Sequence, residues 1–150
     1  MGLKETLQHD LTEAIRSRDE LTSGTIRMIL TAITNEEVSG KAARTLSDAE
    51  IITVLSREAK KRREAADAYR EAGRTDKAEL ETNEGGVIAR YLPEQLSEDA
   101  IKKLIADAIT ETGASGPSGM GLVMKKIQPQ IAGKADGGLV SSLVKAALNG

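Results

Sequence analysis

The near absence of aromatic side chains is the feature that most limits how this chain can fold. Its 150 residues include two Tyr and no Phe or Trp, while hydrophobic residues make up 39%. The core must therefore come from Leu, Ile, Val, Ala and Met, which favours helices packed on helices over a sandwich or barrel. The length fits one domain or two small ones. We expect an all-α protein.

Composition also excludes several kinds of chemistry. The chain has no Cys and a single His, His9, so disulfides, thiolate catalysis and Cys-based zinc sites are excluded, and His9 has no partner at metal-ligand spacing. Residues 1–20 are amphipathic and charged, without the apolar run of a secretory signal. No apolar run approaches the ~18–20 residues of a membrane span. We expect a cytoplasmic protein without membrane, metal or cofactor.

Hydrophobic periodicity predicts four helices in the first part of the chain, over residues 3–18, 20–38, 47–72 and 75–92. The first has an apolar face of Leu3, Leu7, Leu11, Ala14 and Ile15. The third has the clearest start signal, since Ser47 and Glu50 have capping-box spacing and Leu46 precedes them as a hydrophobic staple. In the fourth, Gly85 and Gly86 each cost ~1 kcal/mol relative to Ala, so we expect a kink or break there.

Pro93–Leu96 reads as a linker, because the residue before a proline avoids helical angles. We therefore divide the chain into an N-terminal helical domain, 1–92, and a small C-terminal three-helix domain, 93–150. The first of the three helices follows the cap Ser97 and ends at Gly113. The second begins at Gly116-Pro117 and stops around Pro129, and the third follows the cap Asp136.

The tail from residue 113 to 150 is basic, and glycines recur along it. It holds most of the 14 Gly and carries four Lys against one Asp, whereas the whole chain has a net charge of −2. Helix N-termini with close-approach glycines can accept phosphate, although Asp136 as a cap would occupy such amides. Alternatively, the glycines only end helices and let them pack. The candidate RNA-binding residues are Lys125, Lys126, Lys134, Gly133 and Gly137.

Two further observations shape this prediction. A second basic cluster, Arg57 with residues 60–63, is either a solvated helix face or a phosphate-contacting ridge. Because the tail has no aromatic side chain on which a base could stack, RNA contacts should be to phosphates, riboses and shape.

No phosphate-binding loop, dinucleotide fingerprint or nucleophile elbow is present in the sequence. We expect no catalytic residue and no activity from the chain alone.

Several short motifs resemble the YqeY-like proteins, also called the GatB/YqeY family. They are Thr25-Ile26-Arg27-Met28, Asn35-Glu36-Glu37, Tyr91-Leu92-Pro93-Glu94-Gln95-Leu96, Met120-Gly121-x-Val123-Met124 and Gly133-Lys134-Ala135-Asp136-Gly137. The resemblance covers essentially the whole chain. It implies an all-α fold with a C-terminal part similar to the tail of the amidotransferase B subunit, which helps to grip tRNA.

The resemblance implies a non-catalytic tRNA-binding accessory protein, with tRNA and translation-related proteins as partners. Family members are also described by carbon–nitrogen ligase activity with glutamine as amido donor, which does not follow for the tail-like portion alone. The alternative is a helical protein-interaction module that docks on a synthetase or amidotransferase. Ser118, Gly119 and Leu122 depart from the family pattern, in which Lys-Asp and Lys often flank the Met-Gly, and they weaken the transfer of tRNA contacts to this chain.

Overall fold

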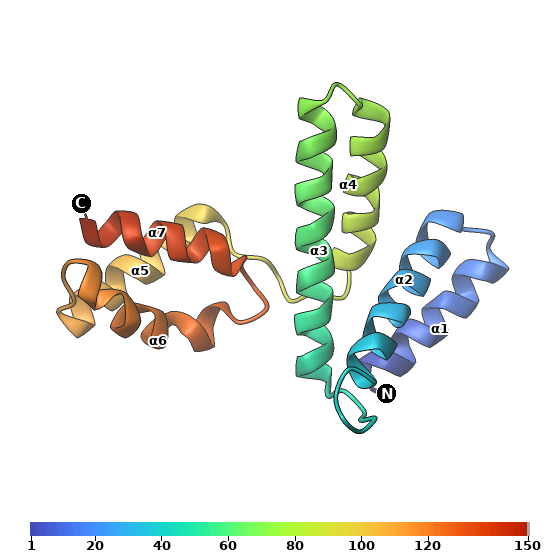
Figure 1. Cartoon of the computed structure of the whole chain (residues 1–150), viewed down its shortest axis with the longest axis horizontal. Coiled ribbons are helices and arrows are strands. Elements are labelled where there is room, and N and C mark those ends of the chain that lie inside the picture. The colour runs from blue at the N-terminus through green and yellow to red at the C-terminus, as the bar shows by residue number, and fades with distance from the viewer. Residues whose placement is uncertain (150) are drawn as a thin grey trace. The chain divides into compact units, whose positions relative to one another are not determined.

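The computed structural model describes residues 1–149 and confirms the all-α prediction. Over that range it contains seven α-helices and one 3-10 turn, and no strand. The chain divides into two compact units, Met1–Leu92 and Pro93–Gly150, and each is described by itself. The helices are α1 (Leu3–Arg16), α2 (Glu20–Glu37), α3 (Asp48–Glu71), α4 (Thr75–Ala89), α5 (Glu98–Thr112), α6 (Met120–Ile131) and α7 (Gly137–Asn149), with the turn η1 (Pro117–Gly119) before α6 (Figure 1).

The N-terminal unit consists of two helical hairpins, α1–α2 and α3–α4 (Figure 1). Their shared core is aliphatic, as the composition predicts, and includes Leu7, Ile26, Ile29, Ile33, Ile51, Leu55 and Ile88. Ile15, which the sequence places on the apolar face of the first helix, lies one residue before the end of α1 and is 49% exposed.

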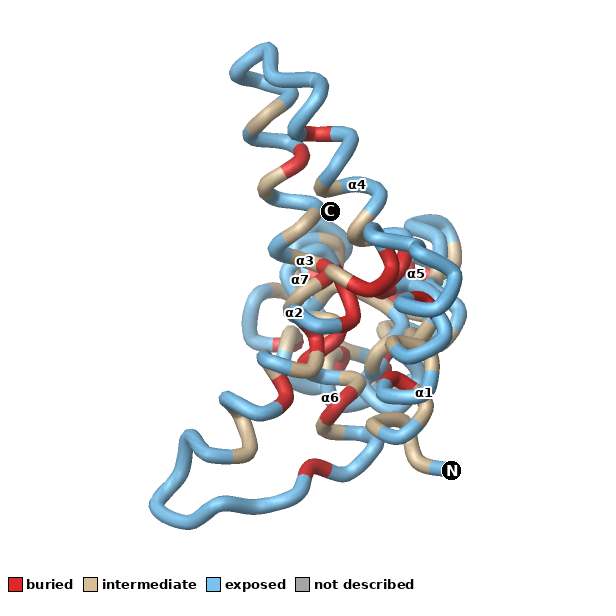
Figure 2. Tube along the Cα trace, turned by 90° about the vertical axis from the view of Figure 1, so that its right-hand side faces the viewer, coloured by how far each residue is buried: buried red, intermediate tan, exposed pale blue. Residues whose placement is uncertain are grey.

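Small residues line the contact between α3 and α4. Ala66 and Ala78 are 2% and 1% exposed, although most of the outer part of this hairpin is exposed (Figure 2). A methyl group added at Gly85 would lie 3.7 Å from the Cβ of Arg62. The predicted break at Gly85 and Gly86 is wrong, since α4 runs through both. Packing against α3 compensates for their poor helix propensity.

Arg62 joins the two helices of this hairpin through ion pairs. Its guanidinium lies 3.5 Å from Glu58 of α3 and 3.0 Å from Glu84 of α4. Burial, together with neighbouring Glu81, raises the pKa of the Glu84 carboxyl, and Arg62 opposes that rise. Three carboxylates therefore surround one guanidinium, and all four side chains are mostly buried.

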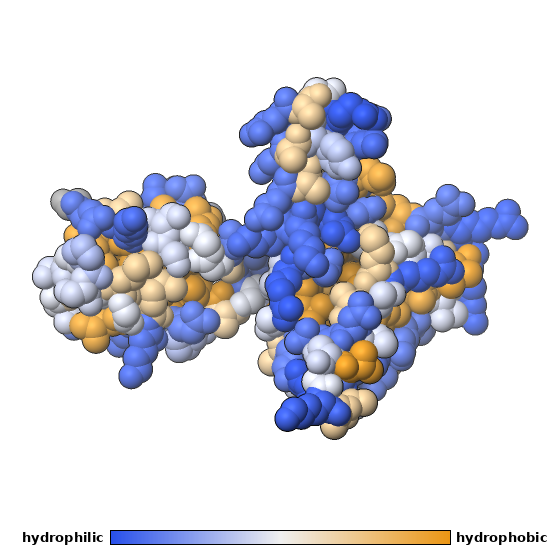
Figure 3. Space-filling model, viewed as in Figure 1, coloured by the Kyte–Doolittle hydropathy of each residue, from blue (hydrophilic) through white to orange (hydrophobic). Residues whose placement is uncertain are grey.

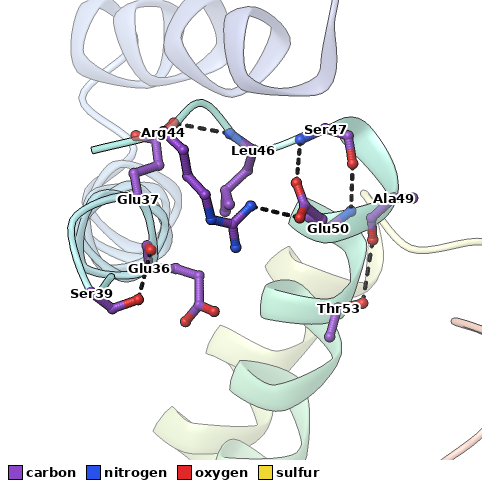
Figure 4. Close-up of polar contacts among 9 residues, drawn as sticks. All are labelled: Glu36, Glu37, Ser39, Arg44, Leu46, Ser47, Ala49, Glu50 and Thr53. Carbon is purple, nitrogen blue, oxygen red and sulfur yellow. Dashed lines mark hydrogen bonds and ion pairs between the residues drawn. The ribbon is translucent and has the colours of Figure 1, made fainter. Parts of the chain in front are cut away.

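The capping box at the start of α3 is confirmed (Figure 4). The Glu50 amide donates to the Ser47 hydroxyl at 3.2 Å, and the Ser47 amide donates to the Glu50 carboxylate at 2.8 Å. Arg44 also donates to Glu50, at 2.6 Å. The hydrogen bond from the Ser47 amide, followed by that from Arg44, lowers the pKa of Glu50. Leu46 is buried in the core at the predicted staple position.

The C-terminal unit is a three-helix arrangement with its own aliphatic core. The core comprises Ile101, Ile105, Ala108, Val123, Ile127, Ile131, Val140 and Val144. Ser97 caps α5 and Gly113 ends it at a φ of +68°, both as predicted. We expected helix α6 to stop around Pro129, but it continues to Ile131. Pro129 is tolerated because it lies in the last turn, where a proline removes one hydrogen bond and little helix follows it.

Candidate nucleic-acid interface

The predicted RNA-binding residues fall into two places in the C-terminal unit, helix α6 and the turn that follows it. Lys125 and Lys126 are neighbours on α6, and both are exposed. Lys126 forms an ion pair with Glu111 of α5 at 3.1 Å, whereas Lys125 forms none within residues 1–149. Of this pair, Lys125 is therefore the lysine whose charge remains open to an anion.

Gly133 and Lys134 use their backbone carbonyls to hold the segment that follows Pro93. The Gln95 side-chain amide donates to the Gly133 carbonyl at 2.9 Å, and the Leu96 amide donates to the Lys134 carbonyl at 2.9 Å. Gly133 adopts a φ of +72°, which only glycine takes without strain. Gly133 is thus needed for the shape of the turn. This agrees with the alternative that the glycines of the tail serve the fold rather than phosphate binding. The Lys134 side chain is exposed and forms no ion pair in the described part of the chain.

Gly137 is the first residue of α7, and the start of this helix is already occupied. The Gly138 amide donates to the Asp136 carboxylate at 3.4 Å. Asp136 therefore binds one of the backbone amides at the start of α7 that an anion would need, and it places a negative charge there. A methyl group added at Gly137 would meet nothing within 4 Å. The geometry does not require glycine at this position, and the α7 N-terminus is a poor anion site.

The charge of the complete unit differs from that of its last 38 residues. Residues 93–150 contain six Lys and six Asp or Glu, because the carboxylates of the linker and α5 balance the lysines that follow. Lys102 lies 3.3 Å from Glu98, and Lys103 lies 4.0 Å from Asp107. Any anion-binding surface of this unit is therefore local.

The basic cluster on α3 is largely neutralised within the N-terminal unit. Arg57 lies 3.7 Å from Glu36, and Lys61 lies 3.1 Å from Glu58. Arg62 is mostly buried between the carboxylates described above. These contacts match the solvated, ion-paired face rather than the phosphate-contacting ridge.

Hydrophobic side chains also reach the surface of the C-terminal unit (Figure 3). Leu122 of α6 is 56% exposed and Leu139 of α7 is 39% exposed. A mostly apolar groove of 280 Å³ lies between α5 and α7, lined by Lys102, Ile105, Ala106, Ile109, Leu143 and Ala147. Such a surface suits a protein partner better than it suits a phosphate backbone.

Sequence reasoning missed how the Tyr91–Leu96 motif is used. Tyr91 donates its hydroxyl to Asp10 of α1 at 2.6 Å, within the N-terminal unit, and burial, followed by this hydrogen bond, raises the pKa of Tyr91. Gln95 and Leu96 instead bind the α6–α7 turn of the C-terminal unit. Reading the segment as a linker hid these contacts, since their partners lie far along the chain.

Residues 1–149 contain no group of three or more His, Asp or Glu placed to hold a metal ion. Within the same range, no helix has both the length and the apolar character that crossing a membrane requires.

Comparison with known proteins gives consistent matches. One similar protein, from Clavispora lusitaniae, is named "Altered inheritance of mitochondria protein 41, mitochondrial"; it is 29% identical over 97% of this chain and 84% of its own length. A namesake from Lachancea thermotolerans is 28% identical over 75% of this chain and 60% of its own. An uncharacterised Schizosaccharomyces pombe protein is 30% identical over 64% of this chain and 76% of its own.

Two of these names refer to mitochondria, whereas we expected a cytoplasmic protein from the sequence. The model of the family described as "Yqey-like protein" matches residues 4–148. This match spans nearly the whole chain and includes all the motifs on which the resemblance was based. The chain therefore belongs to the Yqey-like protein family.

Proposed function

We propose that this protein is a non-catalytic, RNA-binding accessory protein and that its C-terminal unit contacts the phosphates of tRNA. One observation carries the proposal: the ammonium groups of Lys125 and Lys134 are exposed and form no ion pair within residues 1–149. Open lysines are the groups that neutralise phosphate and release its counterions. The resemblance of the C-terminal motifs to a tRNA-gripping tail, inferred from the sequence alone, adds support.

We propose fewer phosphate contacts than the sequence predicts. Lys125 and Lys134 are proposed to contact phosphate directly. Lys126 contributes less, because an incoming phosphate competes with Glu111 for its ammonium group. Gly133 and Gly137 are removed from the proposed contact set, since the first shapes a turn and the second lies beside the Asp136 carboxylate.

The test is the salt dependence of tRNA binding. Each lost phosphate contact lowers the slope of log affinity against log salt by ~0.7–0.9. We expect Lys125→Ala and Lys134→Ala each to lower the slope by about that amount, and exposed Lys41→Ala in the N-terminal unit to leave it unchanged. Glu111→Gln should strengthen binding, because it releases Lys126. Absence of tRNA binding at low salt, or binding unaffected by Lys134→Ala, refutes the proposal.

A second candidate function, docking on a translation-related protein such as a synthetase or amidotransferase, rests on the apolar groove between α5 and α7. A partner helix seated there would cover Ala106 and Ile109 of α5 and Leu143 of α7. Ala106→Glu places a charge in the groove and should abolish association with the purified partner, while tRNA binding is kept. Association that survives both this change and nuclease treatment speaks against the groove.

The cellular compartment is part of the same proposal. The sequence predicts a cytoplasmic location, whereas the names of two fungal relatives refer to mitochondria. Imaging of the full-length tagged protein in its own cells separates the two.

A further inference from the structure

Helix α2 carries few charges, although one side of it is exposed. Residues 21–35 contain a single charged side chain, Arg27, whereas charged residues make up 29% of the chain. Most exposed residues of α3, by contrast, are Lys, Arg, Asp or Glu. The core accounts for only the side of α2 that carries Ile26, Ile29 and Ile33, which are buried. The scarcity of charge on the opposite, outward face needs another explanation.

The outward face of α2 has the spacing of a helix that packs on a second helix. Gly24, Thr31 and Val38 are seven residues apart, and Arg27 and Thr34 lie between them at steps of three and four. All of these except half-buried Gly24 are exposed. Thr is a poorer helix former than Ala, Glu or Lys, so helix stability does not explain two threonines that face water.

Two hydrogen-bonding side chains on this face have no partner in the part of the chain that the structure describes. Arg27 forms no ion pair there, and the side-chain amide of Asn35 forms no hydrogen bond. A guanidinium donates and an amide oxygen accepts, but eight residues of helix hold the two about 12 Å apart along one chain. Both line a shallow groove of 420 Å³, together with Leu30, Thr31 and Thr34.

We propose that the outward face of α2 is the interface of a symmetric homodimer, in which two α2 helices pack antiparallel about a two-fold axis at Thr31. Arg27 and Asn35 each lie four residues from Thr31, so this axis places Arg27 opposite the partner's Asn35, twice. It also places Gly24 opposite the partner's Val38. A parallel pair would instead bring two Arg27 charges together and align the helix dipoles. The dimer goes beyond the proposed function, since it uses only the N-terminal unit.

Cysteine crosslinking of the full-length protein tests the axis, because the chain has no Cys of its own. In Thr31→Cys the two thiols meet at the axis and should form an intermolecular disulfide on oxidation with diamide. Thr12→Cys is the matched control, since Thr12 of α1 is also exposed and its hydroxyl, like that of Thr31, donates to the carbonyl four residues earlier. At about 10 μM protein we expect crosslinking about 100-fold faster at position 31, because paired thiols have an effective concentration of about 1 mM.

The register of the two helices has its own test. A mixture of Gly24→Cys and Val38→Cys proteins should crosslink to a heterodimer, and either protein alone should crosslink more slowly. A methyl group added at Gly24 would meet nothing within 4 Å, so the fold has room for the new side chain.

Sedimentation equilibrium gives an independent measurement. The unaltered protein should have twice the 15.9 kDa mass of one chain. Thr31→Glu brings two carboxylates together at the axis and should raise the dimer Kd by more than about 100-fold, whereas Thr12→Glu should leave it unchanged. Circular dichroism confirms that the helices of each variant are formed.

Three results overturn the inference: a mass of one chain, equal crosslinking at positions 31 and 12, or a dimer that survives Thr31→Glu. A monomer whose binding of RNA or of another protein is lost in Thr31→Glu assigns the face to that partner and likewise overturns the dimer.

Discussion

The side-chain amide of Gln95 donates to the backbone carbonyl of Gly133 at 2.9 Å and to that of Pro93 at 2.8 Å. The first bond spans 38 positions of the chain, and with it the Leu96 amide bonds to the Lys134 carbonyl. One side chain thus connects the start of the C-terminal unit to the turn between its last two helices.

Replacing Gln95 by Ala should destabilise the C-terminal unit by ~0.5–1.5 kcal/mol, the usual net contribution of hydrogen bonds at an exposed site. The Leu96 amide should then exchange faster, because the turn that accepts its hydrogen bond loses a support. Hydrogen exchange of peptides from residues 93–150 measures both effects. Gln130→Ala, at an exposed position on α6, is the control, and equal exchange in the two variants contradicts the role of Gln95.

The two glycines of the Gly133–Gly137 motif should respond in opposite directions to the same substitution. Gly133→Ala forces a side chain into a φ of +72° and should cost ~1–2 kcal/mol. Gly137→Ala adds a methyl group in open space at the start of α7 and should stabilise by up to ~1 kcal/mol. Urea unfolding followed by circular dichroism compares them. Destabilisation by both changes to a similar extent would contradict this assignment.

The pKa of Glu50 lies below its ordinary value of 4.5 because the Ser47 amide and Arg44 bind its carboxylate. A carboxyl whose pKa is lowered by folding stabilises the protein above its unfolded pKa. That stabilisation is lost as the pH falls through the folded pKa. Glu50→Gln keeps a capping-box side chain but cannot titrate. We expect the melting temperature of the unaltered protein to fall more steeply than that of the variant below about pH 4.5, and parallel curves would contradict this.

The α3–α4 hairpin should be sensitive to added volume at its small residues. Ala66→Leu inserts a larger side chain where only 2% of the residue is exposed, and overpacking of this kind costs ~1–3 kcal/mol. Ala68→Leu, at an exposed position of the same helix, should be nearly neutral. Thermal unfolding of the two variants checks the difference, and equal melting temperatures would show that the helices can separate freely.

Local signals were read correctly from the sequence, and signals that depend on distant partners were not. The Ser47–Glu50 capping box and the Gly113 helix stop each depend on residues within one turn of the helix end. The residue types and their spacing are therefore enough to predict these two helix ends. Gly85 and Gly86 suggest a break because propensity considers α4 alone, whereas the close contact with α3 holds the helix together. The tail looked cationic because its balancing carboxylates, such as Glu111, precede it in the chain.

The equal numbers of lysines and carboxylates in residues 93–150 have a kinetic consequence. A unit with equal numbers of positive and negative side chains exerts no net-charge attraction on a polyanion, and salt at physiological strength screens its local charges beyond ~8 Å. Encounters with RNA would then occur at the rate of undirected diffusion, ~10⁵–10⁶ M⁻¹s⁻¹, rather than at the steered rates of strongly basic proteins. Selectivity among RNAs would arise from how long each complex lasts.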